Sequence, residues 1–394
     1  MILNKPLEFL FIVFLLSFDS LLKINFGVLY LQLGLFFVIM FYALRFSLQS
    51  STRSSAVRLI CKDRSLILFI FLTLMYIAVA IEISVFIKLY SYIIIFTILY
   101  LYVDTVNLSQ LNLNIISKIA LVVISFSGII QMSLLSIGDY QIELRGVTEF
   151  YYQKNGDMAA RMRGFFLEPN WFGLVVFGWL YVFIRSMKRF FVSDFLVIIL
   201  SLTCLFLSEN RLIFLFLSLL IFSYVFKPVI NFLKNNLIFL ILFLASLLFI
   251  FFTLSGGIEG DRSASARFVT AFNVVSYMAD APILNLIFGH GFSNWGWYSN
   301  EYLLSVSNYM ADQDLTRRDN SEIYVVFFEM GLVGLMYFAY ELKFLSMKKG
   351  DNLDKVFLAC FYLASLFYPI FTFLIYLPML FIVRNRLVHE VKWE

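Results

Sequence analysis

Hydrophobic runs separated by short polar stretches recur along the whole chain, and most of the runs are close to twenty residues long. A run of this length with few charges is the pattern of a helix that crosses a membrane. About ten such runs are found, at residues 7–22, 26–44, 65–81, 86–103, 115–137, 164–184, 192–207, 212–226, 237–254 and 321–342.

A last apolar stretch, 356–383, is long for one helix and contains Pro369 and Pro378. Because proline interrupts helices, we expect a hairpin of two short helices there. The pattern predicts an all-α polytopic membrane protein with about twelve transmembrane helices, or about eleven if the last stretch is a single span. Residues 1–394 are expected to form one integral membrane domain.

The composition agrees with the pattern. Hydrophobic residues make up 61% of the 394 and charged residues only 14%, whereas soluble domains carry about 25% charged residues. The net charge of +4 is small and gives no reason to expect a nucleic-acid partner. Lys5 precedes the first run, but no small-residue cleavage site follows it, so we expect a retained helix and not a signal peptide.

Basic residues mark alternate loops. The loop 45–64 holds Arg45, Arg53, Arg58, Lys62 and Arg64 against one acidic residue, Asp63. Short basic loops stay on the cytoplasmic side, and counting forward from this loop puts both termini in the cytoplasm. Two segments then face outward, a shorter loop at 138–163 and a large loop at 255–320. Within the large loop, apolar residues at helical spacing from Ser263 to Ala281 predict a helix that lies on the membrane surface.

The segment from Arg161 to Gly173 combines two arginines, Glu168 and Pro169 at the start of an otherwise apolar run. Charge within a membrane is costly, and ionisable residues there are functional candidates. Proline leaves backbone groups unpaired, and such backbone is tolerated only beside protein or water. We interpret this segment as one wall of an active site in the outer half of the membrane.

Arginines gather in the outward-facing segments. Because a guanidinium matches phosphate with two parallel hydrogen bonds, they indicate an anion at the membrane edge, and a lipid diphosphate is the natural anion at that depth. The alternative is that each arginine only extends its charge toward headgroups. The candidates for holding the diphosphate are Arg163, Arg211, Arg267, Arg317 and Arg318.

Other candidates have both a structural and a functional interpretation. Asp319 with Glu322 fits an N-terminal capping box, yet either could act as a base. His290, between two glycines, is a turn residue, a base or a phosphate ligand. Trp295, Trp297 and Tyr298 fit an interfacial aromatic belt or a surface on which sugars stack. Glu329 is expected to pair within the protein.

The sequence contains neither metal-ligand spacing on the outer side nor a nucleotide-binding loop or serine nucleophile turn. Its three cysteines, Cys61, Cys204 and Cys360, are too few and too scattered for a disulfide framework. We therefore expect no cofactor and no metal.

Four patches, in this order, resemble bacterial O-antigen polymerases of the Wzy type, in the superfamily that includes O-antigen ligases. They are Arg163-Gly164 with Glu168-Pro169-Asn170; Ser208-Glu209-Asn210-Arg211; Arg267, Pro282 and Gly289-His290-Gly291; and Asp319-Asn320 with Glu329-Met330-Gly331. Asp319 stands where many relatives carry histidine. A ligase-like catalytic histidine therefore cannot be transferred to this position, and this favours a polymerase.

The resemblance implies a GT-C-like fold with short helices in its large periplasmic loop, in the bacterial inner membrane. It implies metal-independent, inverting glycosyl transfer at the periplasmic face, from a glycan on undecaprenyl diphosphate to a lipid-linked repeat unit. Asp319, Glu322, Glu168 or His290 would act in catalysis, and Asn170 and Asn320 would join the aromatic residues in binding glycan. A chain-length regulator is an expected partner, beside membrane lipid. The alternatives are an O-antigen ligase, or a lipid-linked oligosaccharide flippase that uses Asp19, Glu82, Lys88 and Asp104.

Overall fold

The structure of the protein is a computed structural model that describes residues 4–17, 23–26, 29–106, 108–138, 151–154, 157–166, 169–225, 262–302, 304, 322–364, 377–391 and 393. These residues are overwhelmingly helical, and two short antiparallel hairpins are the exception. The predicted helical class is therefore confirmed for the described part of the chain.

The first half of the chain alternates helices with one hairpin. Its elements are α1 (Lys5–Leu16), β1 (Lys23–Phe26), β2 (Leu29–Gln32), α2 (Leu33–Leu48), α3 (Ser50–Lys62), α4 (Arg64–Met75), the 3-10 turn η1 (Tyr76–Val79), α5 (Ile83–Val106) and α6 (Gln110–Gly138).

The second half contains the other hairpin and shorter helices. They are β3 (Tyr151–Lys154), β4 (Asp157–Ala160), α7 (Pro169–Ser186), α8 (Val192–Leu207), α9 (Arg211–Val225), α13 (Arg262–Ala279), α14 (Ile283–Phe288), α15 (Trp295–Glu301), α16 (Glu322–Met347), α17 (Asn352–Ala364) and α18 (Leu377–Val388).

Three described helices, α5, α6 and α16, are long and apolar enough to cross a membrane, and α2 with α3 would make a fourth if the bent pair is one span. Several shorter apolar helices accompany them, among them α8. The total of twelve or eleven spans stays a prediction, because the expected span 237–254 lies outside the described residues.

The start of the chain corrects one expectation. The runs 7–22 and 26–44 were predicted as two spans, but α1 ends at Leu16 and a hairpin, β1–β2, occupies Lys23–Gln32. Asn25 is a poor helix former, and polar Lys23 and Asn25 alternate with apolar Ile24 and Phe26, a pattern that a strand accommodates. Lys23 is therefore the first residue of a strand, and α1 ends at Leu16.

The helix predicted at Ser263–Ala281 is present as α13, and its place on a membrane surface stays a prediction. Its Val274 and Met278 are fully buried in a cluster with Val325 and Phe328 of α16. Phe272 and Val275 lie on another face and are 73% and 52% exposed. The apolar residues of α13 therefore divide between a face that packs on protein and an exposed face.

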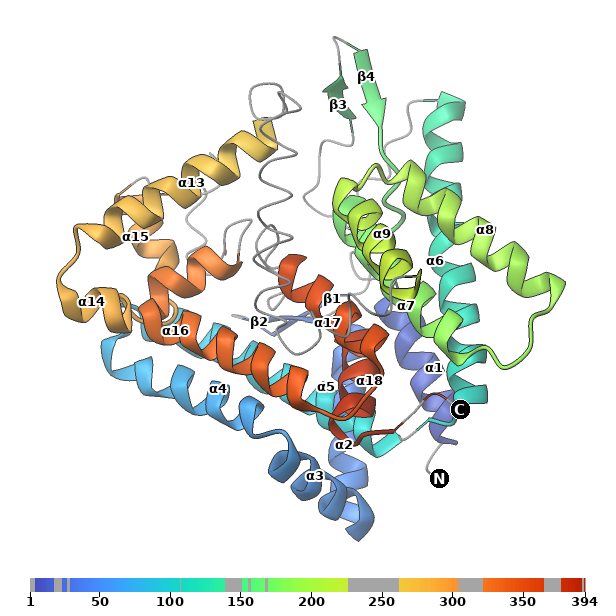
Figure 1. Ribbon diagram of the computed structural model, residues 1–394, viewed down its shortest axis with the longest axis horizontal. Coiled ribbons are helices and arrows are strands. Elements are labelled where there is room, and N and C mark those ends of the chain that lie inside the picture. Colours follow the sequence, from blue (N-terminus) through green and yellow to red (C-terminus); the bar gives the residue numbers. More distant parts are fainter. Residues whose placement is uncertain are drawn as a thin grey trace.

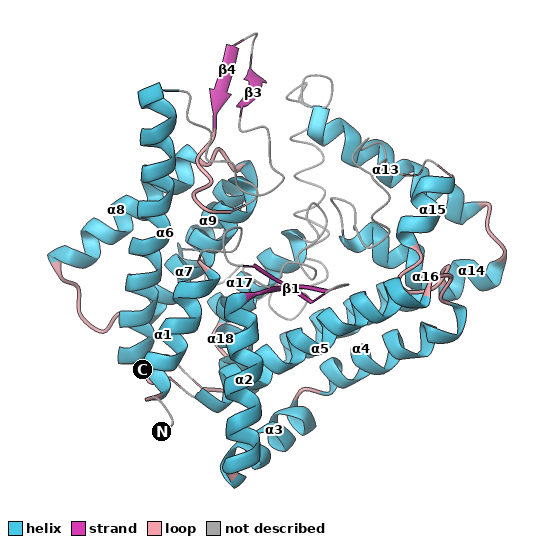
Figure 2. Cartoon of the chain, turned by 180° about the vertical axis from the view of Figure 1, so that it is seen from behind, coloured by secondary structure: helices cyan, strands magenta, loops and turns pink. Residues whose placement is uncertain are grey.

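Both termini lie at the same end of the molecule, which we call the terminal end (Figures 1 and 2). Two groups of helices extend from it. One arm contains α6 to α9, and the other contains α4, α5 and α16 with α13 to α15 packed at its far end (Figure 1). Every motif patch with described residues lies toward the far end of one of these arms.

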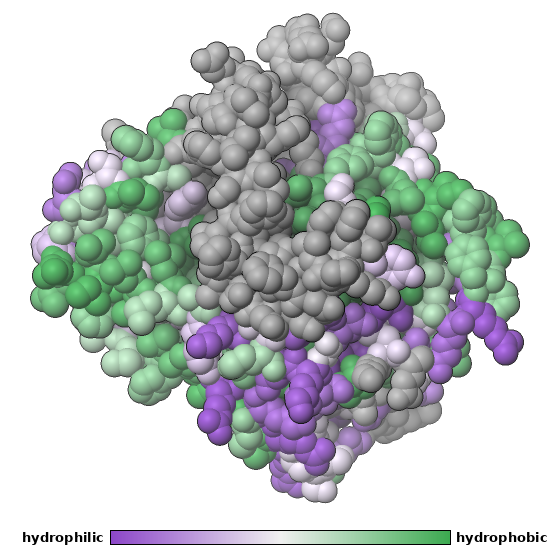
Figure 3. Space-filling view, viewed as in Figure 1, coloured by the Kyte–Doolittle hydropathy of each residue, from purple (hydrophilic) through white to green (hydrophobic). Residues whose placement is uncertain are grey.

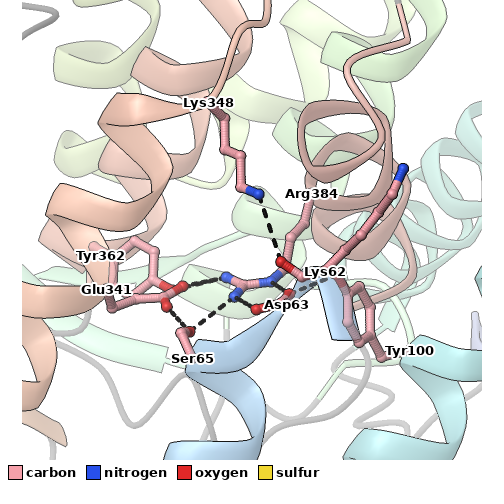
Figure 4. A network of polar contacts seen from close by, with 8 residues as sticks. All are labelled: Lys62, Asp63, Ser65, Tyr100, Glu341, Lys348, Tyr362 and Arg384. Carbon is pink, nitrogen blue, oxygen red and sulfur yellow. Dashed lines mark hydrogen bonds and ion pairs between the residues drawn. The ribbon is translucent and has the colours of Figure 1, made fainter. Parts of the chain in front are cut away.

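A buried polar network holds helices together at the terminal end (Figure 4). Arg384 of α18 donates to both carboxylate oxygens of Asp63, at 2.8 and 2.9 Å, and also pairs with Glu341 of α16. The hydroxyl groups of Tyr100 and Tyr362 donate to these two carboxylates, at 2.7 and 2.6 Å. One guanidinium thus connects α4, α5, α16, α17 and α18.

Candidate functional site

The first two motif patches lie against each other in the first arm. The backbone N–H of Met162 donates to the carbonyl of Leu207 at 3.0 Å. The Arg161 guanidinium donates to the carbonyl groups of Ser208 and Glu209, at 2.9 and 3.2 Å. The segment before α7 is therefore fixed to the turn between α8 and α9.

Two asparagines complete this junction. Arg161 also donates to the side-chain oxygen of Asn170 at 3.1 Å, and the Asn210 amide donates to the Asn170 carbonyl at 3.0 Å. Asn210 Oδ1 in turn accepts from the backbone N–H of Leu212 at 3.1 Å, which satisfies an amide at the start of α9. Predicted site residue Asn170 and the second patch thus share one hydrogen-bond network.

Arg163 lies under this network and is only 1% exposed. Its backbone N–H and that of Gly164 both donate to Gln131 Oε1, at 2.8 and 3.0 Å, and its guanidinium donates to the Phe166 carbonyl at 3.4 Å. Burial lowers the pKa of Arg163 to about 9, because the charged form loses its water. The guanidinium of Arg163 is therefore a cationic group at a position with little solvent.

Gln131 was not among the predicted site residues. It is 3% exposed and orients the backbone on both sides of Arg163 through Oε1. The available signal was an amide inside the apolar run 115–137, where a polar side chain needs a partner. Gly164 is needed beside it, since its φ is +55° and a Cβ would collide with Ser127.

A small hollow lies near this segment, lined by Val13, Leu16, Ser17, Phe166, Val175, Trp179 and Pro378. Its volume of about 10 Å³ is close to the space that a single water molecule needs. A diphosphate requires far more room, so this hollow is not the donor site.

The third and fourth patches meet in the second arm, where α16 is interrupted. Gly331 has φ +61° and ψ −150° inside α16, so carbonyl groups just before it are released from helical bonding. The backbone N–H groups of His290 and Gly291 donate to the carbonyls of Phe328 and Glu329, both at 2.9 Å. Gly289, at φ +76°, lies so close that a Cβ would collide with the Glu329 backbone.

The carboxylate of Glu329 fixes the same loop from within. It is 0% exposed, and its Oε1 accepts from the backbone N–H groups of Ser293 and Trp295, at 3.0 and 3.3 Å. A carboxylate at the start of a helix is stabilised by the free amides there. The prediction that Glu329 pairs within the protein is confirmed.

Aromatic rings surround His290. Its ring stacks on Phe328 with centroids 4.8 Å apart, and Tyr298 and Tyr277 lie 4.8 and 5.4 Å away. Nδ1 lies 3.4 Å from the Asn285 amide, and burial lowers the pKa of the imidazole. Burial therefore favours the neutral form of the His290 imidazole over the charged form.

The predicted glycan-binding aromatics differ in exposure. Trp295 is 1% exposed and its ring meets Phe328 edge-on, as a core residue does. Trp297 and Tyr298 are half-buried, and Tyr302, which stacks on Tyr298, is 52% exposed. Of the aromatic residues in this cluster, Trp297, Tyr298 and Tyr302 therefore keep part of their surface exposed, whereas Trp295 does not.

The remaining predicted residues are only partly covered. Arg211 begins α9, Arg267 lies within α13 and Glu322 begins α16, but the placement of their side chains lies outside what the structure describes. Glu168, Arg317, Arg318, Asp319 and Asn320 lie wholly outside the described residues. Among the described residues no group of three His, Cys, Asp or Glu is arranged to hold a metal ion.

A scan of protein-family models finds none that matches the chain, and a search of curated proteins likewise finds no match.

Proposed function

We propose that this chain is an O-antigen polymerase that joins lipid-linked oligosaccharide repeat units. The sequence resemblance is the origin of the proposal, and one structural observation supports it. The described parts of the four patches, although separated along the chain, associate in two pairs: Asn170 and the neighbouring Arg161 with Ser208 to Asn210, and Gly291 with Glu329.

In the proposed orientation the terminal end is cytoplasmic. The described basic residues Arg53, Arg58, Lys62, Arg64, Lys348 and Lys349 belong to segments at this end, as the positive-inside rule requires. The motif patches are then periplasmic, where undecaprenyl-diphosphate-linked glycans are assembled. The protein would work in the bacterial inner membrane together with a chain-length regulator.

In the proposed reaction an acceptor sugar hydroxyl attacks the anomeric carbon of the donor glycan. The bond from that carbon to the diphosphate oxygen breaks, and undecaprenyl diphosphate leaves with its negative charge. Arg163, Arg211 and Arg267, with Arg317 or Arg318, would stabilise this charge in a site with little water. The proton of the hydroxyl would pass to Asp319, Glu322, Glu168 or His290.

The buried position of Arg163 suits this role. A guanidinium that has lost water interacts more strongly with an approaching anion than one in solution does. The half-buried Trp297 and Tyr298 offer ring faces for sugar, while neutral His290 beside them is able to accept a proton.

A flippase fits less well. Transporters place polar residues near the membrane midplane. Of the residues that favoured a flippase, Asp104 is instead paired with His389 near the terminal end, at 2.7 Å, and Glu82 is exposed at the start of α5.

The experiment is a gel of lipopolysaccharide from a strain whose own copy is replaced by Arg163→Gln. The proposal predicts loss of the long-chain ladder while the protein is still present in the membrane. Lys188→Gln, which removes an exposed charge from the α7–α8 loop, is the matched control and should keep the ladder. A full ladder from Arg163→Gln would contradict the diphosphate role.

A further inference from the structure

Helix α3 differs from the helices around it. Leu33–Leu48 is apolar, but the chain turns by 110° after it, and Ser50–Lys62 is rich in serine and basic residues. Thirteen residues span about 20 Å as a helix, too short and here too polar to cross a membrane. The helix therefore lies across the end of α2 and does not continue it.

One face of α3 is fixed on the protein. Thr52, Ala56 and Leu59 recur at helical spacing and are at most 4% exposed. The Ser55 hydroxyl donates to Asp104 of α5 at 2.5 Å. This packing determines which residues face away from the protein.

The outward face is basic. Arg53, Arg58 and Lys62 are exposed, as is Arg64 at the start of α4. Among the described residues, Arg53, Arg58 and Arg64 form no ion pair or side-chain hydrogen bond. The one acidic residue of the stretch, Asp63, is fully buried and bonded by Arg384.

Apolar side chains flank these charges. Val57, between Arg53 and Cys61 on the outward face, is 61% exposed. Leu44 and Leu48, on the last turns of α2, are 49% and 68% exposed. Figure 3 shows hydrophilic side chains gathered at the lower part of the molecule, the region of α3 in Figure 1, with hydrophobic surface to their upper left and upper right. This combination is typical of a helix at the boundary between acyl chains and headgroups.

We propose that α3 is an interfacial helix whose Arg53, Arg58 and Lys62 bind the headgroups of anionic phospholipids. The opposite charge of the headgroups complements a basic face that the described part of the protein does not neutralise. The apolar side chains of Leu48 and Val57 fix the helix at the matching depth. The inference concerns a surface remote from the motif patches and does not rest on the polymerase activity.

Cys61 gives a direct probe of this face, because it is exposed while Cys204 and Cys360 are buried. The purified full chain in neutral detergent is labelled at Cys61 with bimane. It is then titrated with phosphatidylglycerol that carries a nitroxide on its headgroup, and bimane quenching gives the apparent affinity. Each basic residue near an anionic surface contributes about fivefold in affinity, so Arg53→Gln/Arg58→Gln should weaken binding by roughly tenfold or more.

Two further variants make the outcome specific. Lys188→Gln/Arg189→Gln removes the same charge from another exposed loop and should leave the affinity unchanged. Arg53→Lys/Arg58→Lys keeps the charge and should keep most of the binding. The proposal is overturned if Arg53→Gln/Arg58→Gln binds phosphatidylglycerol as the unmodified protein does, or if both double glutamine variants lose affinity equally. It is also overturned if nitroxide-labelled phosphatidylcholine quenches bimane as well as nitroxide-labelled phosphatidylglycerol does.

Discussion

Two arginines two residues apart have different environments. Arg161 spreads three hydrogen bonds over Ser208, Glu209 and Asn170, whereas Arg163 is buried beneath it with little solvent. The planar guanidinium of arginine, with its five N–H donors, suits the three acceptors around Arg161. The ammonium group of lysine does not. We infer that Arg161 maintains the junction of the two patches, whereas the proposed diphosphate role of Arg163 is left to be tested.

This division predicts a stability effect for Arg161→Gln. Hydrogen bonds to charged groups contribute about 1.5–3 kcal/mol each, and part of this is recovered by solvent at a partly exposed site. We expect the free energy of unfolding in detergent to fall by about 2–3 kcal/mol. Arg189→Gln, at an exposed position, should change it by less than about 0.5 kcal/mol. Equal stability of both variants would contradict the assigned role.

His290 predicts a dependence on pH. Burial lowers the pKa of His290 from 6.5, so the unfolded state binds its proton more readily than the folded state does. The contribution of His290 to the free energy of unfolding is therefore fully present above pH 6.5, the unfolded pKa. It is lost as the pH falls through the lower, folded pKa.

Thermal unfolding of the purified protein, from neutral to mildly acidic pH, measures this effect. His290→Gln should reduce the loss of stability on acidification, while His389→Gln, which removes the other histidine, should leave the His290 contribution in place. If His290→Gln retains the full acid slope, the buried neutral imidazole is not its source.

At the scale of elements, the interruption of α16 is the feature that builds the second patch pair. Gly331 turns the backbone, and a Cβ there would lie 2.6 Å from Gly289 N. The released carbonyls receive the amides of His290 and Gly291, while the Glu329 carboxylate receives those of Ser293 and Trp295. The loop that carries His290 is thus positioned by the middle of another helix.

Glu329→Ala should therefore loosen this loop. It leaves two buried amides without an acceptor, at about 1–3 kcal/mol each, so we expect a loss of about 2–4 kcal/mol in the free energy of unfolding. Glu329→Gln keeps a carbonyl oxygen and should lose less. Hydrogen exchange at residues 289–295 is the local measurement. Unchanged protection of that segment in Glu329→Ala would refute the positioning role.

The elements show what a sequence can and cannot reveal. Helices such as α8 and α13 were found with their bounds nearly correct, because twenty apolar residues or a helical repeat is a local signal. The β1–β2 hairpin was missed, since Leu29 to Leu31 leads almost directly into the apolar run that forms α2. The hydrogen bond from His290 to the Phe328 carbonyl could not be predicted either. It depends on the break in α16, which the sequence shows only as one glycine, Gly331.

At the scale of the whole molecule, buried charges are paired at the terminal end. Arg384 links five helices through Asp63, Glu341, Tyr100 and Tyr362 (Figure 4). Arg45 with Glu8, and Arg185 with Asp351, add ion pairs at 2.7 and 2.5 Å. These pairs join helix ends that are far apart in sequence, so they stabilise the base from which both arms extend.

A variant that removes one member of the Arg384 network tests whether the network holds the helices together. Arg384→Met leaves two buried carboxylates without their counter-charge, and breaking a buried pair in this way costs about 3–5 kcal/mol. The triple variant Arg384→Met/Asp63→Asn/Glu341→Gln removes the uncompensated charge and should recover much of the loss. Chemical unfolding in detergent gives both values. If Arg384→Met is as stable as the unmodified protein, the network does not hold the helices together.

We propose that the chain polymerises lipid-linked repeat units, and the lipopolysaccharide banding pattern of a deletion strain is the direct test of this function. We expect lipopolysaccharide core that carries a single repeat unit in the deletion strain. The unmodified chain should restore the long ladder, and Arg163→Gln should not. Bare core in the deletion strain would instead indicate a ligase or a flippase, and an unchanged ladder would contradict any role in O-antigen assembly.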